Sequence, residues 1–229
     1  MTTQPIDDRL LELIRTKGAL NIAVMDTSLK IFSRLKLLLQ QLETTLLSEF
    51  NKEKIKVQCT ARGMYEVELR VSDDILIFIL HSNIFVFDSQ SPVFKSPYVK
   101  SDPSRASCGM ISVYNFLADS VTFDRMHDVG QLTGRIFINN EEHFFVEGKK
   151  QLGVLFNDFG TALATEENIQ KVIEAILLYC IEIDCNVPPI ESMKEITVND
   201  VRSYTIQNAI DSGNKLGFKF QNTKPNIQS

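Results

Sequence analysis

Hydrophobic residues in the first fifth of the chain recur at helical spacing. An apolar stripe with intervals of three and four residues predicts a long helix over residues 26–50. A shorter helix is predicted over residues 5–17, because Pro5 suits a first helical position and Gly18 suits the residue just beyond a helix end. Residues 19–25 fit a strand and a continuing helix equally well, so the pattern leaves them open.

The predicted helix over residues 26–50 is apolar over well more than one third of its circumference. A helix of this kind needs apolar cover on two sides. Enclosure by the rest of the chain and contact with a second copy of the chain both satisfy that need, and the sequence does not choose between them.

The period then changes from helical spacing to strict alternation. Residues 54–62 and 64–71 each alternate apolar and polar side chains, which predicts two strands with one wet face. Matching their apolar faces pairs Ala61 with Tyr65 and leaves a three-residue loop at 62–64. These residues therefore predict a β-hairpin.

The next two predicted strands, residues 75–81 and 84–88, are apolar on both faces. Continuous hydrophobic strands are covered above and below in folded proteins. Residues 89–107 then break the pattern with three prolines and six serines, and an irregular connection of this length is either functional or a flexible surface excursion. As a binding loop for an anionic or planar ligand, this segment offers Phe94, Lys95, Tyr98, Lys100 and Arg105.

The remaining pattern predicts more strands and two C-terminal helices. Together with the earlier elements it predicts an α+β fold: an antiparallel meander of about seven strands packed with two N-terminal and two C-terminal helices. A helical segment at residues 1–52 is expected to pack on a main domain over residues 53–229. The later strands are predicted at residues 110–117, 134–139 and 143–149, with further strand signals at 120–123 and 216–220, and the helices at 165–184 and 197–211.

Composition is that of a globular protein and points to no cofactor. Hydrophobic residues make up 44% of the chain and charged residues 23%. The polar N-terminus lacks the features of a signal peptide, and no apolar run is long enough to cross a membrane. The four cysteines lie in no zinc-binding spacing. These features indicate a protein of the reducing cytoplasm that has neither a disulfide scaffold nor a structural zinc site.

Charge argues against nucleic acid as a partner. The net charge of −5 is unevenly distributed, and residues 115–211 hold 16 acidic against 7 basic side chains. A protein that binds nucleic acid needs a basic face that displaces counterions.

One short stretch nevertheless resembles a nuclease motif. In "HFFVEGK", Glu147 stands two residues before Lys149 at the end of a predicted strand, and Glu142 lies in the preceding turn. This arrangement resembles the PD-(D/E)xK nucleases, and the resemblance implies that carboxylates hold Mg²⁺ while the lysine steadies the attacking water. The family's Pro-Asp pair is absent, and Asn139 stands where an acid would help. An acid two residues before a lysine arises about twice by chance in a chain of this composition, so a solvated strand end is the simpler interpretation.

A second acidic stretch offers a candidate metal site. Asp124, His127 and Asp128 are spaced so that one helical turn brings them together, although an exposed charged turn explains them as well. His81 ends an apolar strand and is interpreted as a histidine with a partner at the core edge. The glycine-rich, nucleophile-elbow and zinc-protease motifs are all missing.

The sequence therefore favours a non-catalytic binding or regulatory module of the cytoplasm. We expect a homodimer formed through the leucine-rich helix or an apolar sheet face, with a protein or a small molecule as a further partner. A metal-dependent phosphodiesterase using Glu147 and Lys149 is the alternative.

Overall fold

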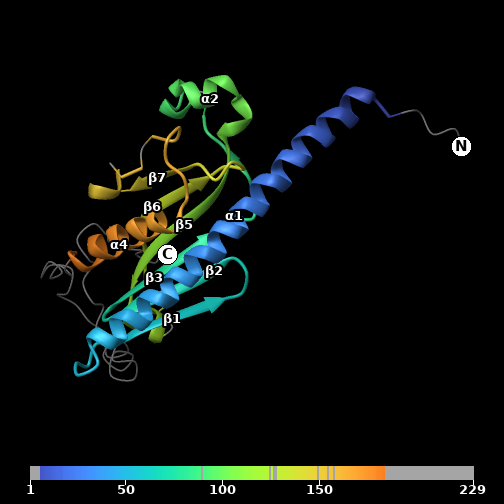
Figure 1. Ribbon diagram of the computed structural model, residues 1–229. Helices are drawn as coiled ribbons and strands as arrows, with labels where there is room; N and C mark the ends of the chain where they lie inside the picture. Colours follow the sequence, from blue (N-terminus) through green and yellow to red (C-terminus); the bar gives the residue numbers. More distant parts are fainter. Residues whose placement is uncertain are drawn as a thin grey trace, which may run out of the picture.

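The protein is an antiparallel sheet covered on one face by two helices. The computed structural model describes residues 6–88, 90–123, 125, 128–148, 150–153, 155–156 and 158–183. The main path of the seven-stranded sheet runs β1-β2-β3-β5-β6-β7, and β4 pairs with β5 beside it. Figure 1 shows α1 and α4 crossing the same side of this sheet. The predicted α+β class is therefore confirmed.

The helices and strands have the following bounds. The strands are β1 Val57–Arg62, β2 Glu66–Val71, β3 Asp74–Leu80, β4 Phe85–Val86, β5 Ser107–Leu117, β6 Gln131–Ile138 and β7 Phe144–Gly148. The α-helices are α1 Asp8–Glu49, α2 Pro97–Ser101, α3 Ala118–Thr122 and α4 Glu166–Ile181, and the 3₁₀-helices are η1 Pro92–Lys95, η2 Pro103–Ala106 and η3 Lys150–Gly153.

A single helix replaces the two predicted at the N-terminus. α1 runs for 42 residues without a break, so the predicted stop at Gly18 is wrong and residues 19–25 are helical. Gly18 does not adopt the positive φ of a helix-ending glycine. A helix tolerates one internal glycine at a cost of about 1 kcal/mol relative to alanine, which the good helix formers around it offset. The helix begins at Asp8 and is capped by Asp7, whose side chain accepts a hydrogen bond from the backbone of Arg9.

The first hairpin forms with a shifted register. Ala61 lies opposite Val67 rather than Tyr65, and the turn occupies residues 63–65. The shift is two residues, so every side chain keeps its predicted face. Gly63 supplies the positive φ, 71°, that the turn requires.

The main core lies between the sheet and the two helices. Phe32 and Leu35 of α1 are at most 1% exposed, and Phe78 of β3 is fully buried. α1 passes very close to β5 at Gly109, because a Cβ atom there would lie 2.1 Å from the hydroxyl oxygen of Ser28. Glycine is therefore required where the helix crosses the strand.

The opposite face of the sheet is covered unevenly. Leu76, Phe78 and Leu80 of β3 face the helices and are buried, whereas Ile77 and Ile79 on the other face are half-buried. In β4, Val86 is 60% exposed. The prediction that residues 75–88 are covered on both sides thus holds for the helix side and only in part for the other.

One end of that second face is covered by residues 90–106, which we call the cap. The sequence predicted an irregular connection here, but the cap consists of η1, α2 and η2 in succession. Each short helix is preceded by a capping side chain and begins with proline. The capping residues are Ser91, Ser96 and Asp102. Their apolar neighbours join β4, β5 and β6 in a second core cluster that includes Val99, Met110 and Phe137.

The later elements divide into confirmed and corrected predictions. α4 is capped by Thr165, as predicted, and the predicted hairpin of residues 134–139 and 143–149 is formed by β6 and β7. The strand signals at 120–123 instead belong to α3. The elements predicted at 197–211 and 216–220 lie outside the described residues, and no finding tests the division at residue 52.

Candidate functional site

The described carboxylates of the proposed nuclease site lie apart. Glu147 pairs with Arg135, which is its neighbour across β6 and β7. Glu142 lies in the turn before β7 and pairs with Lys30 and Arg34 of α1. Four residues stand between the two acids, and an extended chain of that length would separate their Cα atoms by about 17 Å. Lys149 lies outside the described residues, so the motif itself stays a prediction.

The candidate metal site is described only in part. Asp124 and His127 lie outside the described residues. Asp128 accepts a hydrogen bond from the Ser120 hydroxyl and lies 3.7 Å from the guanidinium of Arg125. Within the part of the chain that the structure describes, no group of three acidic, histidine or cysteine side chains is arranged to hold a metal ion.

The five cap residues proposed as a binding loop separate into three environments. Phe94 packs against the second core cluster, and Lys95 and Lys100 are exposed to solvent. Tyr98 and Arg105 turn toward the β6–β7 turn and meet there. Two of the five predicted binding residues, Tyr98 and Arg105, therefore belong to one side-chain cluster.

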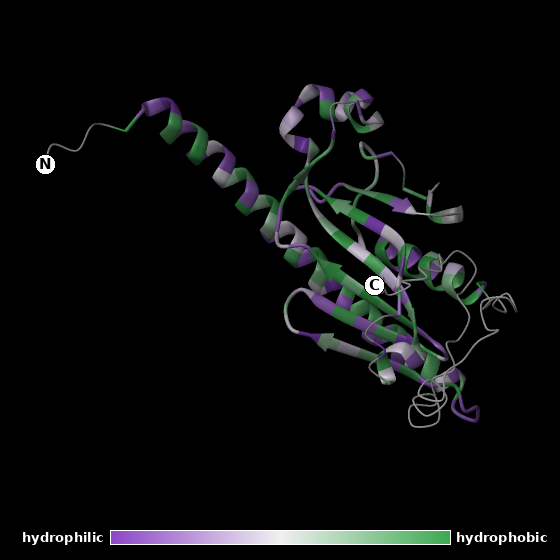
Figure 2. Cartoon of the chain, turned by 180° about the vertical axis from the view of Figure 1, so that it is seen from behind, coloured by the Kyte–Doolittle hydropathy of each residue, from purple (hydrophilic) through white to green (hydrophobic). Residues whose placement is uncertain are grey.

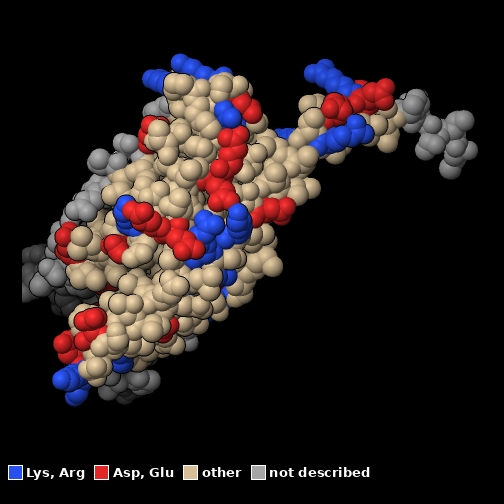
Figure 3. All heavy atoms as spheres, viewed as in Figure 1, with Lys and Arg blue, Asp and Glu red and all other residues tan. Residues whose placement is uncertain are grey.

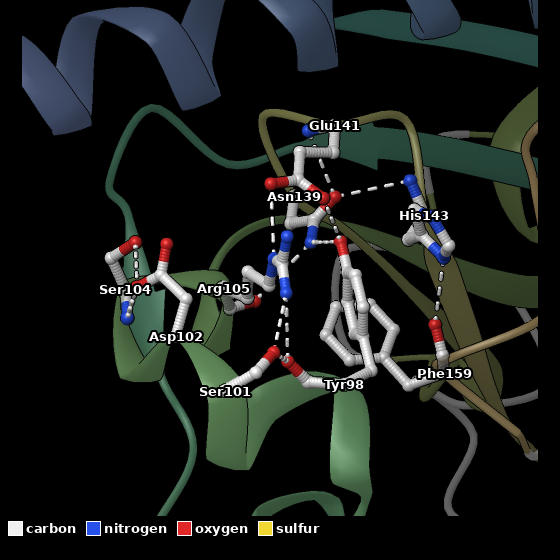
Figure 4. Close-up of polar contacts among 9 residues, drawn as sticks. All are labelled: Tyr98, Ser101, Asp102, Ser104, Arg105, Asn139, Glu141, His143 and Phe159. Atoms are coloured by element: carbon white, nitrogen blue, oxygen red, sulfur yellow. Dashed lines mark hydrogen bonds and ion pairs between the residues drawn. The ribbon is translucent and has the colours of Figure 1, made fainter.

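Figure 4 shows this cluster, which we call the Tyr98 cluster and which comprises Tyr98, Arg105, Asn139, Glu141 and His143. The Tyr98 hydroxyl donates to one oxygen of Glu141 at 2.7 Å, and Arg105 Nε donates to the other at 3.0 Å. Asn139, fully buried, donates to the Tyr98 hydroxyl at 2.9 Å and accepts from the backbone of Glu141 and His143. Every polar group at its centre thus has a partner within the chain.

The aromatic ring of Tyr98 is held on both faces. The His143 ring stacks on it with centroids 4.3 Å apart, and the Arg105 guanidinium lies 4.4 Å from its centroid. Burial, followed by the hydrogen bond to Glu141, raises the pKa of Tyr98 well above its usual value. The same hydrogen bond is the main reason that the pKa of Glu141 is lowered. The tyrosine therefore stays protonated and the glutamate ionised near neutral pH.

This arrangement fastens the cap to the β6–β7 turn. Each Glu141 oxygen accepts a hydrogen bond from a cap residue, one from Tyr98 and one from Arg105. Tyr98 and Glu141 are 43 residues apart in sequence, which explains why local patterns did not reveal their contact.

A serine–histidine pair lies on the same face of the sheet. His81 Nε2 is 3.0 Å from the hydroxyl of Ser112, so the histidine has the partner that the sequence suggested. This distance suits proton transfer from a nucleophile. Ser112 is only 2% exposed, however, and its hydroxyl has no path to a substrate in this conformation.

A polar groove of about 330 Å³ lies beside the edge strand β1. Its charged side chains bond within the chain: Arg62 pairs with Glu68, and Arg70 donates to the hydroxyl of Thr122. These charged side chains of the groove are therefore already engaged by other residues of the chain.

Unlike these polar groups, the apolar surface at the start of α1 is left uncovered by the rest of the described chain. Residues 6–23, which we call the arm, project away from the sheet (Figure 1). Figure 2 shows hydrophobic bands along the whole arm. Several of its large apolar side chains are more than two-fifths exposed: Ile6, Leu10, Leu11, Leu13, Ile14 and Ile22. The sequence missed this surface because it ended the helix at Gly18.

Comparison with protein-family models, with curated proteins and with solved structures gives no match. Among the described residues, no helix combines the length and the apolarity needed to cross a membrane.

Proposed function

We propose that the protein is a non-catalytic interaction module that acts as a homo-oligomer through the arm of α1. The observation that carries the proposal is the exposure of large apolar side chains on a helix that leaves the body of the protein. Leu13 is 56% exposed and Ile14 is 61% exposed. Contiguous apolar surface of this kind marks interaction sites in soluble proteins.

Helix physics supports the same proposal. The arm contains about four turns of helix that touch no sheet strand along most of their length (Figure 1). Helices of this length are marginal in water on their own, since most helical stability in proteins comes from packing an apolar face. A partner that covers the arm would supply that packing.

The environment of the polar candidates supports a non-catalytic role. Glu142, Glu147 and Glu141 are each engaged by cationic side chains of the chain. No observation favours the nuclease alternative, which stays a prediction. We also propose a cytoplasmic location, which is supported by the free thiols of the three cysteines in the described residues.

Light scattering coupled to size-exclusion chromatography tests the proposal. We expect the mass at tens of micromolar to exceed that of the 26.0 kDa chain and to fall to it in Leu10→Glu/Leu13→Glu. Leu37→Glu is the matched control, because Leu37 is 60% exposed on the same helix but lies outside the arm. A wild-type monomer at these concentrations, or an equal loss in the control, would refute the proposal.

A further inference from the structure

The arm carries an apolar seam that is interrupted by one charge. Leu10, Leu13 and Lys17 follow one another at intervals of three and four residues, and so lie along one line of the helix; Ile6 precedes its first turn. The same line continues to Val24, which is the first fully buried residue of α1. The seam is therefore the uncovered extension of the face that packs on the sheet.

We propose that two arms pair antiparallel, with the two-fold axis passing between Leu11 and Glu12. This inference rests on the proposed self-association and adds its geometry. In that register Leu10 of one chain faces Leu13 of the other, and Lys17 lies beside the N-terminal end of the second helix. Each apolar residue of the seam then contacts a side chain of the second copy.

Charge selects this orientation over the parallel one. The N-terminal end of the arm holds Asp7 and Asp8, whereas Arg15 and Lys17 lie about two turns later. A parallel pair would place Lys17 against Lys17 in the middle of the seam and bring the acidic ends together. The antiparallel pair instead separates the two lysines and places each Lys17 near Asp7 of the second copy.

The charge balance of the arm also disfavours a membrane surface as the occupant. The arm holds three acidic and three basic side chains, and Figure 3 shows both signs at its tip. Helices that lie on anionic membranes carry a strongly basic polar face. Equal numbers of the two signs suit a self-complementary protein partner instead.

Antiparallel pairing of the arms leaves room for the sheets of both chains. The two helices would overlap over residues 8–15, a length of about 12 Å, and residues 16–23 of each would act as spacers. The Val24 residues of the two chains would then lie about 37 Å apart along the helix axis. An overlap this short is below the size of a standard stable interface, so we expect dissociation in the micromolar range.

Distance measurement between spin labels tests the orientation. Ala23 is exposed at the base of the arm, and an Ala23→Cys variant is labelled in a background carrying Cys59→Ser and Cys185→Ser. Antiparallel pairing predicts a label separation of about 35 Å, from a rise of about 1.5 Å per residue, whereas parallel pairing predicts about 10 Å. A dimer with the short separation would overturn the antiparallel inference and leave the proposed self-association standing; a monomer would remove both.

Discussion

The two halves of α1 present one apolar face to two different surroundings. In residues 24–49 that face is buried against the sheet, and Val24, Phe32 and Leu39 are at most 1% exposed. In residues 6–23 the same face meets solvent. Helical periodicity therefore tells which side chains require cover but not whether the chain or a partner supplies it.

Truncating one side chain from each half gives the largest expected contrast. Phe32→Ala leaves a cavity under α1 and should lower the free energy of unfolding by about 3–5 kcal/mol. Leu13→Ala should change it by less than about 0.5 kcal/mol in the dilute monomer, because the side chain packs against nothing there. Urea unfolding followed by circular dichroism at low micromolar concentration measures both. Similar losses in the two variants would erase the distinction between the halves.

The crossing of α1 over β5 gives the next largest effect. A methyl group at Gly109 would lie 2.8 Å from the Cβ atom of Ser28, so the helix or the strand must move. We expect Gly109→Ala to cost about 2–3 kcal/mol of unfolding free energy. Adding Ser28→Gly should recover much of that loss, and a failure to recover would show that the close contact is not its cause. Dimer formation by the arm should persist in the rescued variant.

The cap is a useful counter-example, because its cover comes from within the chain and depends on the Tyr98 cluster. Glu141→Gln should lower stability at pH 7 by about 1 kcal/mol, since it weakens the hydrogen bonds from Tyr98 and Arg105. The folded pKa of Glu141 is lowered, so its contribution is complete above the unfolded pKa and is lost as pH falls through the folded value. The difference between wild type and variant should therefore shrink between pH 6 and pH 3.

Glu167→Gln is the matched control for that experiment. The pKa of Glu167 is also lowered, by its hydrogen bond with Lys171, but the pair lies on the open surface of α4. We expect a smaller loss of stability than in Glu141→Gln. Equal effects would mean that the Tyr98 cluster contributes no more than an ordinary surface pair.

The smallest expected effect concerns Gly18 in the arm. No atom lies within 4 Å of an added methyl group, so Gly18→Ala should stabilise the arm helix by about 0.5–1 kcal/mol. Amide hydrogen exchange of residues 8–23 should slow, while exchange in residues 24–49 stays unchanged. Faster exchange in the arm would indicate that Gly18 ends a helix after all.

Sequence patterns revealed the elements whose signals are local. The Thr165 cap and the apolar stripe of α4 lie within one segment, as does the alternation of β1 and β2. The short cap helices were missed although Ser-Pro and Asp-Pro pairs mark their starts at residues 91, 96 and 102. The Tyr98 cluster could not be read from local patterns, because its members come from the cap and from the β6–β7 turn.

Hydrogen exchange of the arm as a function of protein concentration tests the central claim most directly. If a second copy covers residues 8–23, their protection should increase from low to high micromolar concentration, while residues 24–49 remain equally protected throughout. Protection of the arm that does not depend on concentration would contradict the account.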